Sequence, residues 1–76
     1  MSVTVRIEAS ARMRAQARDP KYLTEQADID AIEGDLTLPI YPRIGDFIGW
    51  PDGRSHTVQQ FCWFTDGETP IVVVGD

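Results

Sequence analysis

The chain begins with a long alternation of apolar and polar residues that runs from Val3 to Arg18. Because successive side chains of a β-strand point to opposite faces, a period of two predicts one buried and one exposed face. We expect a strand over Val3–Ala9 that bends or bulges near Ala9–Ala11 and continues to Ala17. Its exposed face would carry four arginines, Arg6, Arg12, Arg14 and Arg18.

A helix is the competing interpretation of the second half of this segment. Residues 9–18 are rich in Ala, Arg, Met and Gln, which are good helix formers, and Ser10 could cap such a helix. The apolar residues nevertheless fall two apart and form no helical stripe, so the alternation favours the strand.

Residues 19–35 predict one short helix. Asp19 and Pro20 suit an N-cap and a first helical position, and Thr24-Glu25 offers a second start. Gly34 is placed to end the helix. The apolar residues at helical spacing are Leu23, Ala27, Ala31 and Ile32.

The pattern in the remainder of the chain favours β-structure. Proline and glycine predict a turn over Pro51–Arg54, and Asp66-Gly67 is typical of a two-residue hairpin. The predicted strands are Leu36–Leu38, Phe47–Trp50, Ser55–Phe64 and Ile71–Val74.

These elements predict a single domain over residues 1–76, mostly β or α+β. It would be a small antiparallel sheet or half-open barrel of four or five strands with one short helix. The last three strands would form a meander, and the long first strand would pair with it to close the barrel.

One stretch of the chain resembles a known family. The residues concerned are Leu38-Pro39, then Pro42-Arg43-x-Gly45-Asp46-x-Ile48, then Val58 and Trp63 before a valine-rich last strand. This pattern over residues 38–74 resembles small SH3-like β-barrel domains. In such domains a Pro-x-x-Gly-Asp stretch often leads into the first meander strand. The resemblance implies a barrel but no single function, since such barrels serve peptide binding, nucleic-acid binding and oligomeric enzymes alike.

At 76 residues, the chain is near the lower limit for a domain that folds alone. Its single cysteine excludes an internal disulfide, and its single histidine argues against a structural zinc site, so we expect no cofactor and no metal. Oligomerisation is the remaining way to add buried surface, and we expect a homo-oligomer, first of all a dimer. With no apolar run long enough to span a bilayer and no signal peptide, we expect a cytoplasmic protein without membrane contact.

Charge is divided unevenly along the chain. Residues 1–22 hold five Lys/Arg against two acids, a balance of +3, and residues 23–76 hold two arginines against ten acids, a balance of −8, which sum to −5. The division either keeps the protein soluble or brings a basic strand face against an acidic partner, such as a second copy. The low sequence pI of about 4.6 argues against nucleic-acid binding. The acids Asp28, Asp30, Glu33 and Asp35 lack calcium-loop spacing and suggest a solvated acidic face.

The segment Phe61-Cys62-Trp63-Phe64 is apolar on both faces of its predicted strand. Two explanations are open: both faces are covered within one chain, or one face packs on another copy or a ligand. Cys62 should then be a buried, inert thiol. Trp50, beside the predicted turn, is the aromatic residue that we most expect to be partly exposed and functional.

The leading functional hypothesis is a non-enzymatic binding or assembly module that self-associates and presents an aromatic surface. The alternatives are a small oligomeric enzyme with an inter-subunit pocket built from His56, Arg54, Asp52 and Trp50, and an acidic inhibitor that mimics nucleic acid. Ser55 and His56 are strand neighbours that point to opposite faces, so no catalytic residue is assigned. Candidate partner-binding residues are Trp50, Trp63, Tyr41, Arg54 and His56, and candidate interface residues are Arg12, Arg14, Phe61 and Phe64.

Overall fold

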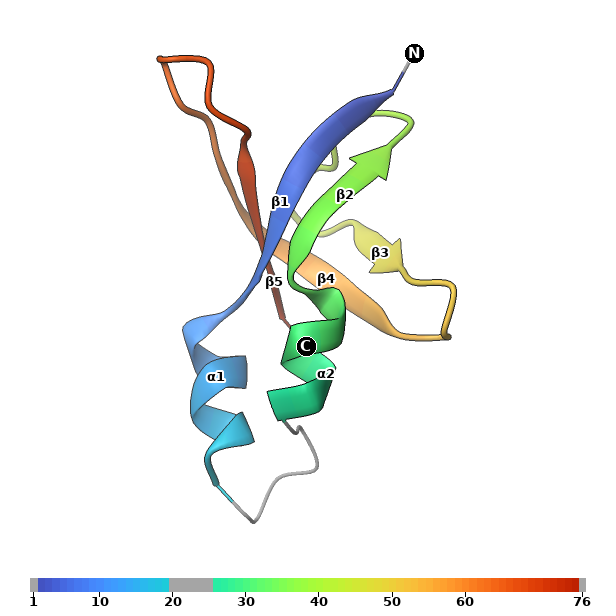
Figure 1. The fold of residues 1–76 in the computed structure, drawn as a ribbon, viewed down its shortest axis with the longest axis vertical. Coiled ribbons are helices and arrows are strands. Elements are labelled where there is room, and N and C mark those ends of the chain that lie inside the picture. Colours follow the sequence, from blue (N-terminus) through green and yellow to red (C-terminus); the bar gives the residue numbers. More distant parts are fainter. Residues whose placement is uncertain (1, 20–25, 76) are drawn as a thin grey trace.

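The computed structural model describes residues 2–19 and 26–75 as a small curled sheet with two short helices at one end (Figure 1). The sheet has five strands in the order β2-β1-β5-β4-β3, and it curls into a half-barrel, as the sequence predicts. The elements are β1 (Val3–Ala9), α1 (Ala11–Ala17), α2 (Gln26–Ile32), β2 (Gly34–Leu38), β3 (Phe47–Gly49), β4 (Ser55–Cys62) and β5 (Ile71–Gly75).

The strand pairing confirms the predicted meander, because β3, β4 and β5 pair in turn as antiparallel neighbours. The first strand does not close the barrel. It lies inside the sheet, parallel to β5 and antiparallel to β2, so that the sheet is mixed and not wholly antiparallel. The half-barrel therefore stays open between its two edge strands, β2 and β3.

The predicted continuation of the first strand to Ala17 is wrong. Ser10 caps α1 by accepting a hydrogen bond from the Met13 N–H to its Oγ at 3.2 Å, and the helix turns Met13 into the core. The cap and the helix propensity of Ala, Arg, Met and Gln outweigh the alternation. The predicted bend near Ala9 is the turn from strand to helix. The apolar face that the alternation predicted beyond it consisted mostly of alanines, and two of them, Ala11 and Ala15, are exposed.

The arginine-rich strand face is wrong for the same reason. Only Arg6 lies on β1, and Arg12 and Arg14 are exposed on α1, with Arg18 at its C-cap.

The second helix buries Ile32 as predicted, but the rest of its buried face differs from the prediction. Ile29 and Ile32 are buried, whereas Ala27 and Ala31 are exposed, because the larger isoleucines gain more from burial than the alanines. The chain leaves the helix through Gly34, whose φ of 125° suits a glycine, as predicted. The two predicted helix starts at Pro20 and Thr24, and the apolar position at Leu23, lie outside the described residues.

The buried core is aliphatic. It fills the concave face of the sheet and continues under the two helices. Its members are Val5, Ile7, Ala9, Met13, Ile29, Ile32, Ile48, Val58, Val72 and Val74. No aromatic side chain in the described part of the chain belongs to this buried set.

The acidic segment 28–35 keeps Asp30 and Asp35 exposed, in keeping with the solvated acidic face that the sequence suggests, and arginines pair with three of its four carboxylates. Ion pairs join Arg6 to Asp35 at 3.5 Å, Arg54 to Asp28 at 2.8 Å, and Arg14 to Glu33. They tie this segment to β1, to α1 and to the turn between β3 and β4. The opposite charges of the two parts of the chain therefore meet within one molecule.

Glu33 has a further structural role. Its Oε2 accepts a hydrogen bond from the Ala9 N–H at 3.0 Å, where β1 ends, and Arg14 Nε donates to the carbonyl of Ala9. Glu33 and Arg14 therefore satisfy backbone groups of β1 just beyond its pairing with β2.

Candidate functional site

Three aromatic rings form a cluster at the end of the half-barrel opposite the helices, which we call the aromatic surface: Tyr41, Phe61 and Trp63. The ring centroids of Tyr41 and Trp63 are 4.7 Å apart, those of Phe61 and Trp63 are 4.9 Å apart, and Tyr41 meets Phe61 edge-on at 5.7 Å. Phe61 is half-buried against the core, whereas Trp63 is 62% exposed. The rings thus form a preorganised apolar surface that is partly open to solvent, most of all at Trp63.

A β-bulge in β4 decides which side chains reach this surface. The register with β5 shifts between Val58 and Gln60, which places Phe61 opposite the fully buried Val72. Phe61 therefore shares the concave face with the core, and Trp63 follows two residues later. Cys62 points the other way and is exposed, so the prediction of a buried thiol is wrong.

Tyr41 reaches the rings from the loop that joins β2 to β3. The Gly45 N–H donates to the Val58 carbonyl and the Val58 N–H donates to the Asp46 carbonyl, both at 2.8 Å, so this end of the loop is fixed to β4. The Asp46 carboxylate accepts the Arg43 N–H at 2.8 Å and closes a turn. This is the Pro-x-x-Gly-Asp stretch singled out in the sequence, and it leads into β3 as predicted.

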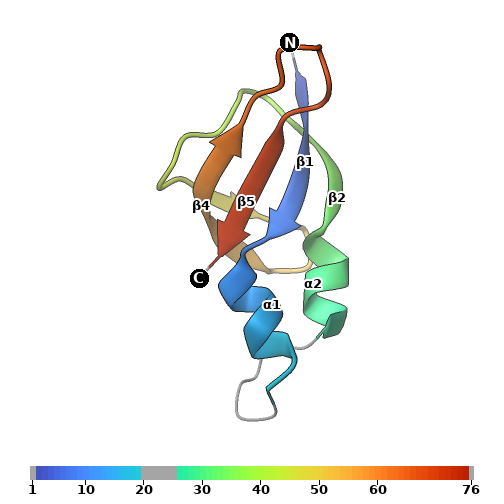
Figure 2. The same cartoon turned by 90° about the vertical axis from the view of Figure 1, so that its left-hand side faces the viewer.

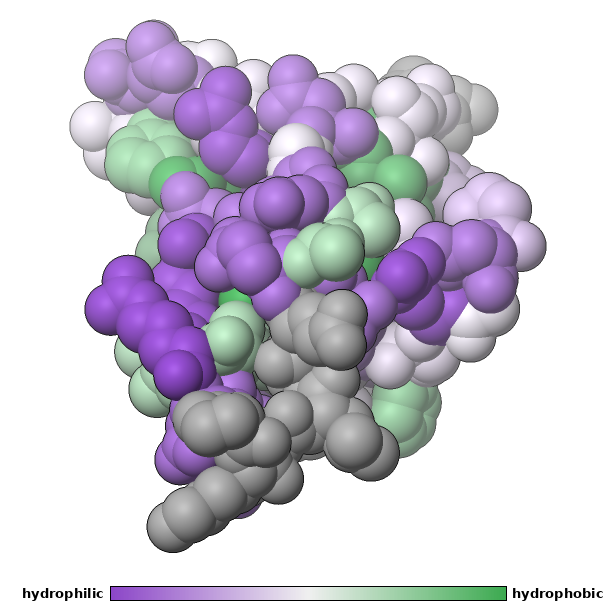
Figure 3. Space-filling model, turned by 60° about the horizontal axis from the view of Figure 1, so that its bottom comes forward, coloured by the Kyte–Doolittle hydropathy of each residue, from purple (hydrophilic) through white to green (hydrophobic). Residues whose placement is uncertain are grey.

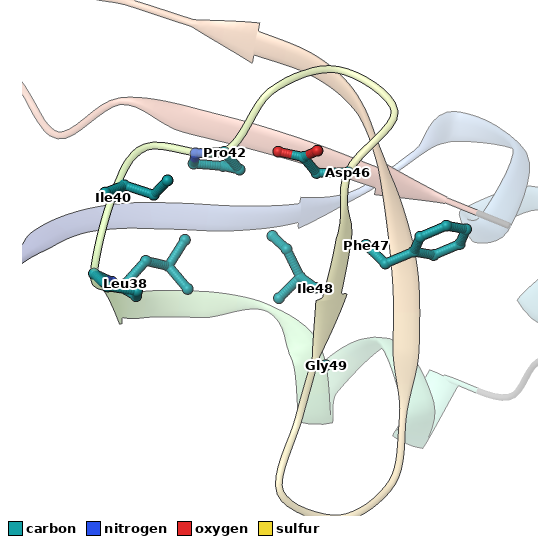
Figure 4. Close-up of a pocket in the computed structure, with 8 residues that line it drawn as sticks. Leu38, Ile40, Pro42, Asp46, Phe47, Ile48 and Gly49 are labelled. Carbon is teal, nitrogen blue, oxygen red and sulfur yellow. The ribbon is translucent and has the colours of Figure 1, made fainter.

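A pocket of about 290 Å³ lies between the two edge strands (Figure 4). The side chains of Leu38 from β2 and Ile48 from β3 point toward each other across it, and the ring of Phe47 points away. Ile40 and Pro42 complete its apolar wall. The pocket marks the place where the half-barrel is open.

Four of the predicted site residues meet at the turn between β3 and β4. The rings of Trp50 and His56 lie edge-to-face with centroids 5.7 Å apart. The Trp50 N–H donates to the Arg54 carbonyl, and Gly53, with φ of 95°, donates its N–H to the Trp50 carbonyl, which confirms the predicted turn. The fourth residue, Asp52, accepts the Arg54 N–H at 3.0 Å.

The charged side chains at this turn are paired with each other within the chain. The pKa of Asp52 lies below its ordinary value, chiefly because the backbone N–H of Arg54 donates to the carboxylate. The pKa of Arg54 is raised by hydrogen bonds to Asp28 and to Asp52. Since the guanidinium is engaged by two carboxylates, it is poorly placed to bind an anionic ligand.

The structure does not unite Trp50 and Trp63 in one surface. They lie near opposite ends of β4, roughly 20 Å apart at about 3.3 Å per strand residue. Trp50 is half-buried and packs against the aliphatic core, whereas Trp63 is largely exposed.

The predicted interface residues also separate. Arg12 and Arg14 lie on α1, whereas Phe61 lies near the end of β4 and Phe64 in the loop that joins β4 to β5. Figure 2 shows α1 and this loop at opposite ends of the molecule. That loop spans residues 63–70 and is longer than the predicted two-residue hairpin. Phe64 lines a second pocket of about 300 Å³ with Arg6 and Ile71.

Sequence reasoning missed strongly exposed apolar residues, among them Ile40 and Phe47, which are 73% and 76% exposed. A signal was available for Ile40, since it lies between Pro39 and Pro42. Proline disfavours a paired strand, so an apolar residue between two prolines has no regular element to bury it. Phe47 had no such signal, because alternation in β3 allows either Phe47 or its neighbour Ile48 to face the core, and Ile48 is the buried one.

Among residues 2–19 and 26–75, no three His, Cys, Asp or Glu side chains gather in a way that could hold a metal ion. In the same part of the chain, every helix is too short to cross a membrane. Comparison with known protein families, with curated proteins and with solved structures finds no match to this chain.

Proposed function

We propose that this chain is a non-enzymatic assembly module that self-associates, with the aromatic surface of Tyr41, Phe61 and Trp63 packed against a second copy of the chain. The observation that carries the proposal is the division of apolar residues. The buried core is aliphatic, and the aromatic side chains of the described residues lie outside it. Aromatic residues usually dominate cores, and where they cluster in the open they are typical of interfaces.

The size of the domain supports a second copy as the partner. A chain of 76 residues buries a smaller fraction of its surface on folding than a larger domain does, and its core contributes little net stability. Covering Trp63 and Ile40, which are mostly exposed, would add apolar burial that one copy lacks. Tyr and Trp also suit a surface that is wet in the free chain and dry in the complex.

The test compares two exposed aromatic residues. Trp63→Ser removes a ring from the aromatic surface, and Phe47→Ser removes a ring that is more exposed but points away from the pocket. We expect Trp63→Ser to weaken self-association by about tenfold or more, as for an interface hot spot, and Phe47→Ser to leave it nearly unchanged. A dilution series followed by analytical ultracentrifugation measures both dissociation constants. Equal effects of the two variants would overturn the role of the aromatic surface.

The enzyme alternative would use the turn where Trp50, Asp52, Arg54 and His56 meet. The engagement of Arg54 by two carboxylates argues against it. The assembly module predicts that His56→Ala leaves self-association intact.

We also propose that residues 38–74 form an SH3-like arrangement. The Pro42–Asp46 turn that leads into β3 and the meander of β3, β4 and β5 support this likeness. A barrel of this kind carries no function by itself, so the aromatic surface and not the fold supports the functional proposal.

A further inference from the structure

The two edges of the sheet differ in how well they are protected. The edge strand β3 is short, covering Phe47–Gly49, and it runs straight into the Pro51 turn. The other edge, β2, is longer, covering Gly34–Leu38, and it contains no proline, no lysine and no bulge. Sheet edges are normally protected by such devices against pairing with another chain. The edge of β2 carries one exposed charge, at Asp35, and none of the other devices, and its residues are exposed or half-buried.

The hydrogen bonds of β1 show which backbone groups point outward from β2. The N–H groups of Arg6 and Ser10 donate to carbonyls on the β5 side. This direction alternates along a strand, so the N–H and C=O groups of Val5 point to β2, where Val5 pairs with Leu36. The N–H and C=O groups of Leu36 therefore point to β1. Those of its neighbours, Asp35 and Thr37, point away from the sheet.

We propose that β2 pairs with β2 of a second copy in antiparallel fashion, so that two half-barrels share one continuous sheet. This inference rests on the proposed self-association and specifies its geometry. A two-fold axis beside Leu36 places Asp35 of one copy opposite Thr37 of the other, and each such pair exchanges both backbone hydrogen bonds. The two Leu36 side chains then meet as a non-hydrogen-bonded pair, the arrangement in which side chains approach most closely.

The side chains of β2 suit this register. Leu36 and Leu38 are half-buried on the concave face, so a second strand beside them would cover apolar surface. Asp35 faces threonine and not another carboxylate across the axis, and it already pairs with Arg6 at 3.5 Å. Like charges therefore do not oppose each other. The apolar pattern is self-complementary and no two carboxylates stand directly opposite each other, which is why the partner is a second copy.

The same register connects the edge with the aromatic surface. Residues 39–41 follow β2 directly, so in an antiparallel pair this segment of each copy lies beside the Gly34 end of the other copy's β2. The interface would thus have strand pairing at its centre and Ile40 and Tyr41 at both flanks.

Thr37→Pro tests the pairing, because it removes an outward N–H and leaves the N–H groups that pair with β1 in place. Thr37→Val is the matched control, since it keeps the N–H and the β-branched shape. We expect Thr37→Pro to weaken self-association by about tenfold or more and Thr37→Val to leave it nearly unchanged, as measured by ultracentrifugation. Circular dichroism checks that the variants fold.

Amide hydrogen exchange of the unaltered protein is the second measurement, which does not depend on a variant. We expect exchange at Asp35 and Thr37 to slow as the protein concentration rises, while exchange at Phe47 and Gly49 on the opposite edge stays constant. Concentration-independent exchange at Asp35 and Thr37 in a protein that dimerises overturns the strand pairing and leaves the proposed function standing. A protein that stays monomeric throughout overturns both.

Discussion

The helical end of the molecule and its aromatic end differ in how far their side chains are buried or paired within one chain. At the helical end, Ile29 is fully buried, and Glu33 and Asp28 are paired with arginines. The surface there is mostly hydrophilic, with apolar side chains in small separate patches (Figure 3). At the aromatic end, Trp63 and Ile40 are left in solvent beside an open sheet edge. The first end buries and pairs its side chains within one chain, whereas the second leaves apolar side chains that a partner would cover.

Removing a core side chain at the helical end should have the largest effect on folding. Ile29→Ala leaves a cavity in the core and should lower the free energy of unfolding by about 2–5 kcal/mol. Trp63→Ser, at the aromatic end, should lower it by less than about 1 kcal/mol, because a mostly exposed side chain loses little on truncation. Urea denaturation of both variants at one low protein concentration measures the difference. A larger loss for Trp63→Ser would reverse the comparison between the two ends.

Removing the carboxylate of Glu33 should have the next largest effect on the free energy of unfolding. Glu33→Ala removes the acceptor for the Ala9 N–H and the ion pair with Arg14, at a cost of about 1–2 kcal/mol in the free energy of unfolding. Asp35→Asn is the matched comparison, because it removes only the exposed pair with Arg6 and should cost about 0–1 kcal/mol. Equal costs in urea denaturation would show that Glu33 has no role beyond its charge.

The smallest expected effect is the pH dependence at the turn between β3 and β4. Since Arg54 lowers the pKa of Asp52 in the folded chain, this carboxylate stabilises the fold above its ordinary pKa, and the contribution disappears as the pH falls through the lowered value. Asp52→Asn should therefore reduce stability slightly at neutral pH and not in strong acid. Denaturation curves at both pH values check this, and a difference that persists in acid would assign the effect to something other than charge.

Much of the fold could be predicted from the sequence, and the failures have a common cause. Strands with large β-branched residues, such as Val3–Ala9 and Ile71–Gly75, follow their pattern because burial enforces it. Where the pattern was made of alanines, as in Ala11–Ala17, burial gains little, and the Ser10 cap and helix propensity decide the outcome.

The candidate site was harder to predict because it depends on long-range placement. Tyr41, Phe61 and Trp63 were singled out from the sequence, but their contact depends on the bulge in β4, which no local signal marks. Trp50 was grouped with Trp63, although the length of β4 keeps them apart. The pairing of the acidic segment with Arg6, Arg14 and Arg54 likewise follows from the topology and not from sequence spacing.

If the aromatic end and the β2 edge form an interface between two copies, the mass of the protein in solution depends on its concentration. Light scattering behind size exclusion, over a wide range of protein concentration, tests it most directly. We expect a species of twice the 8.5 kDa chain mass that dissociates on dilution. A particle that keeps the mass of one chain at the highest concentration would contradict it.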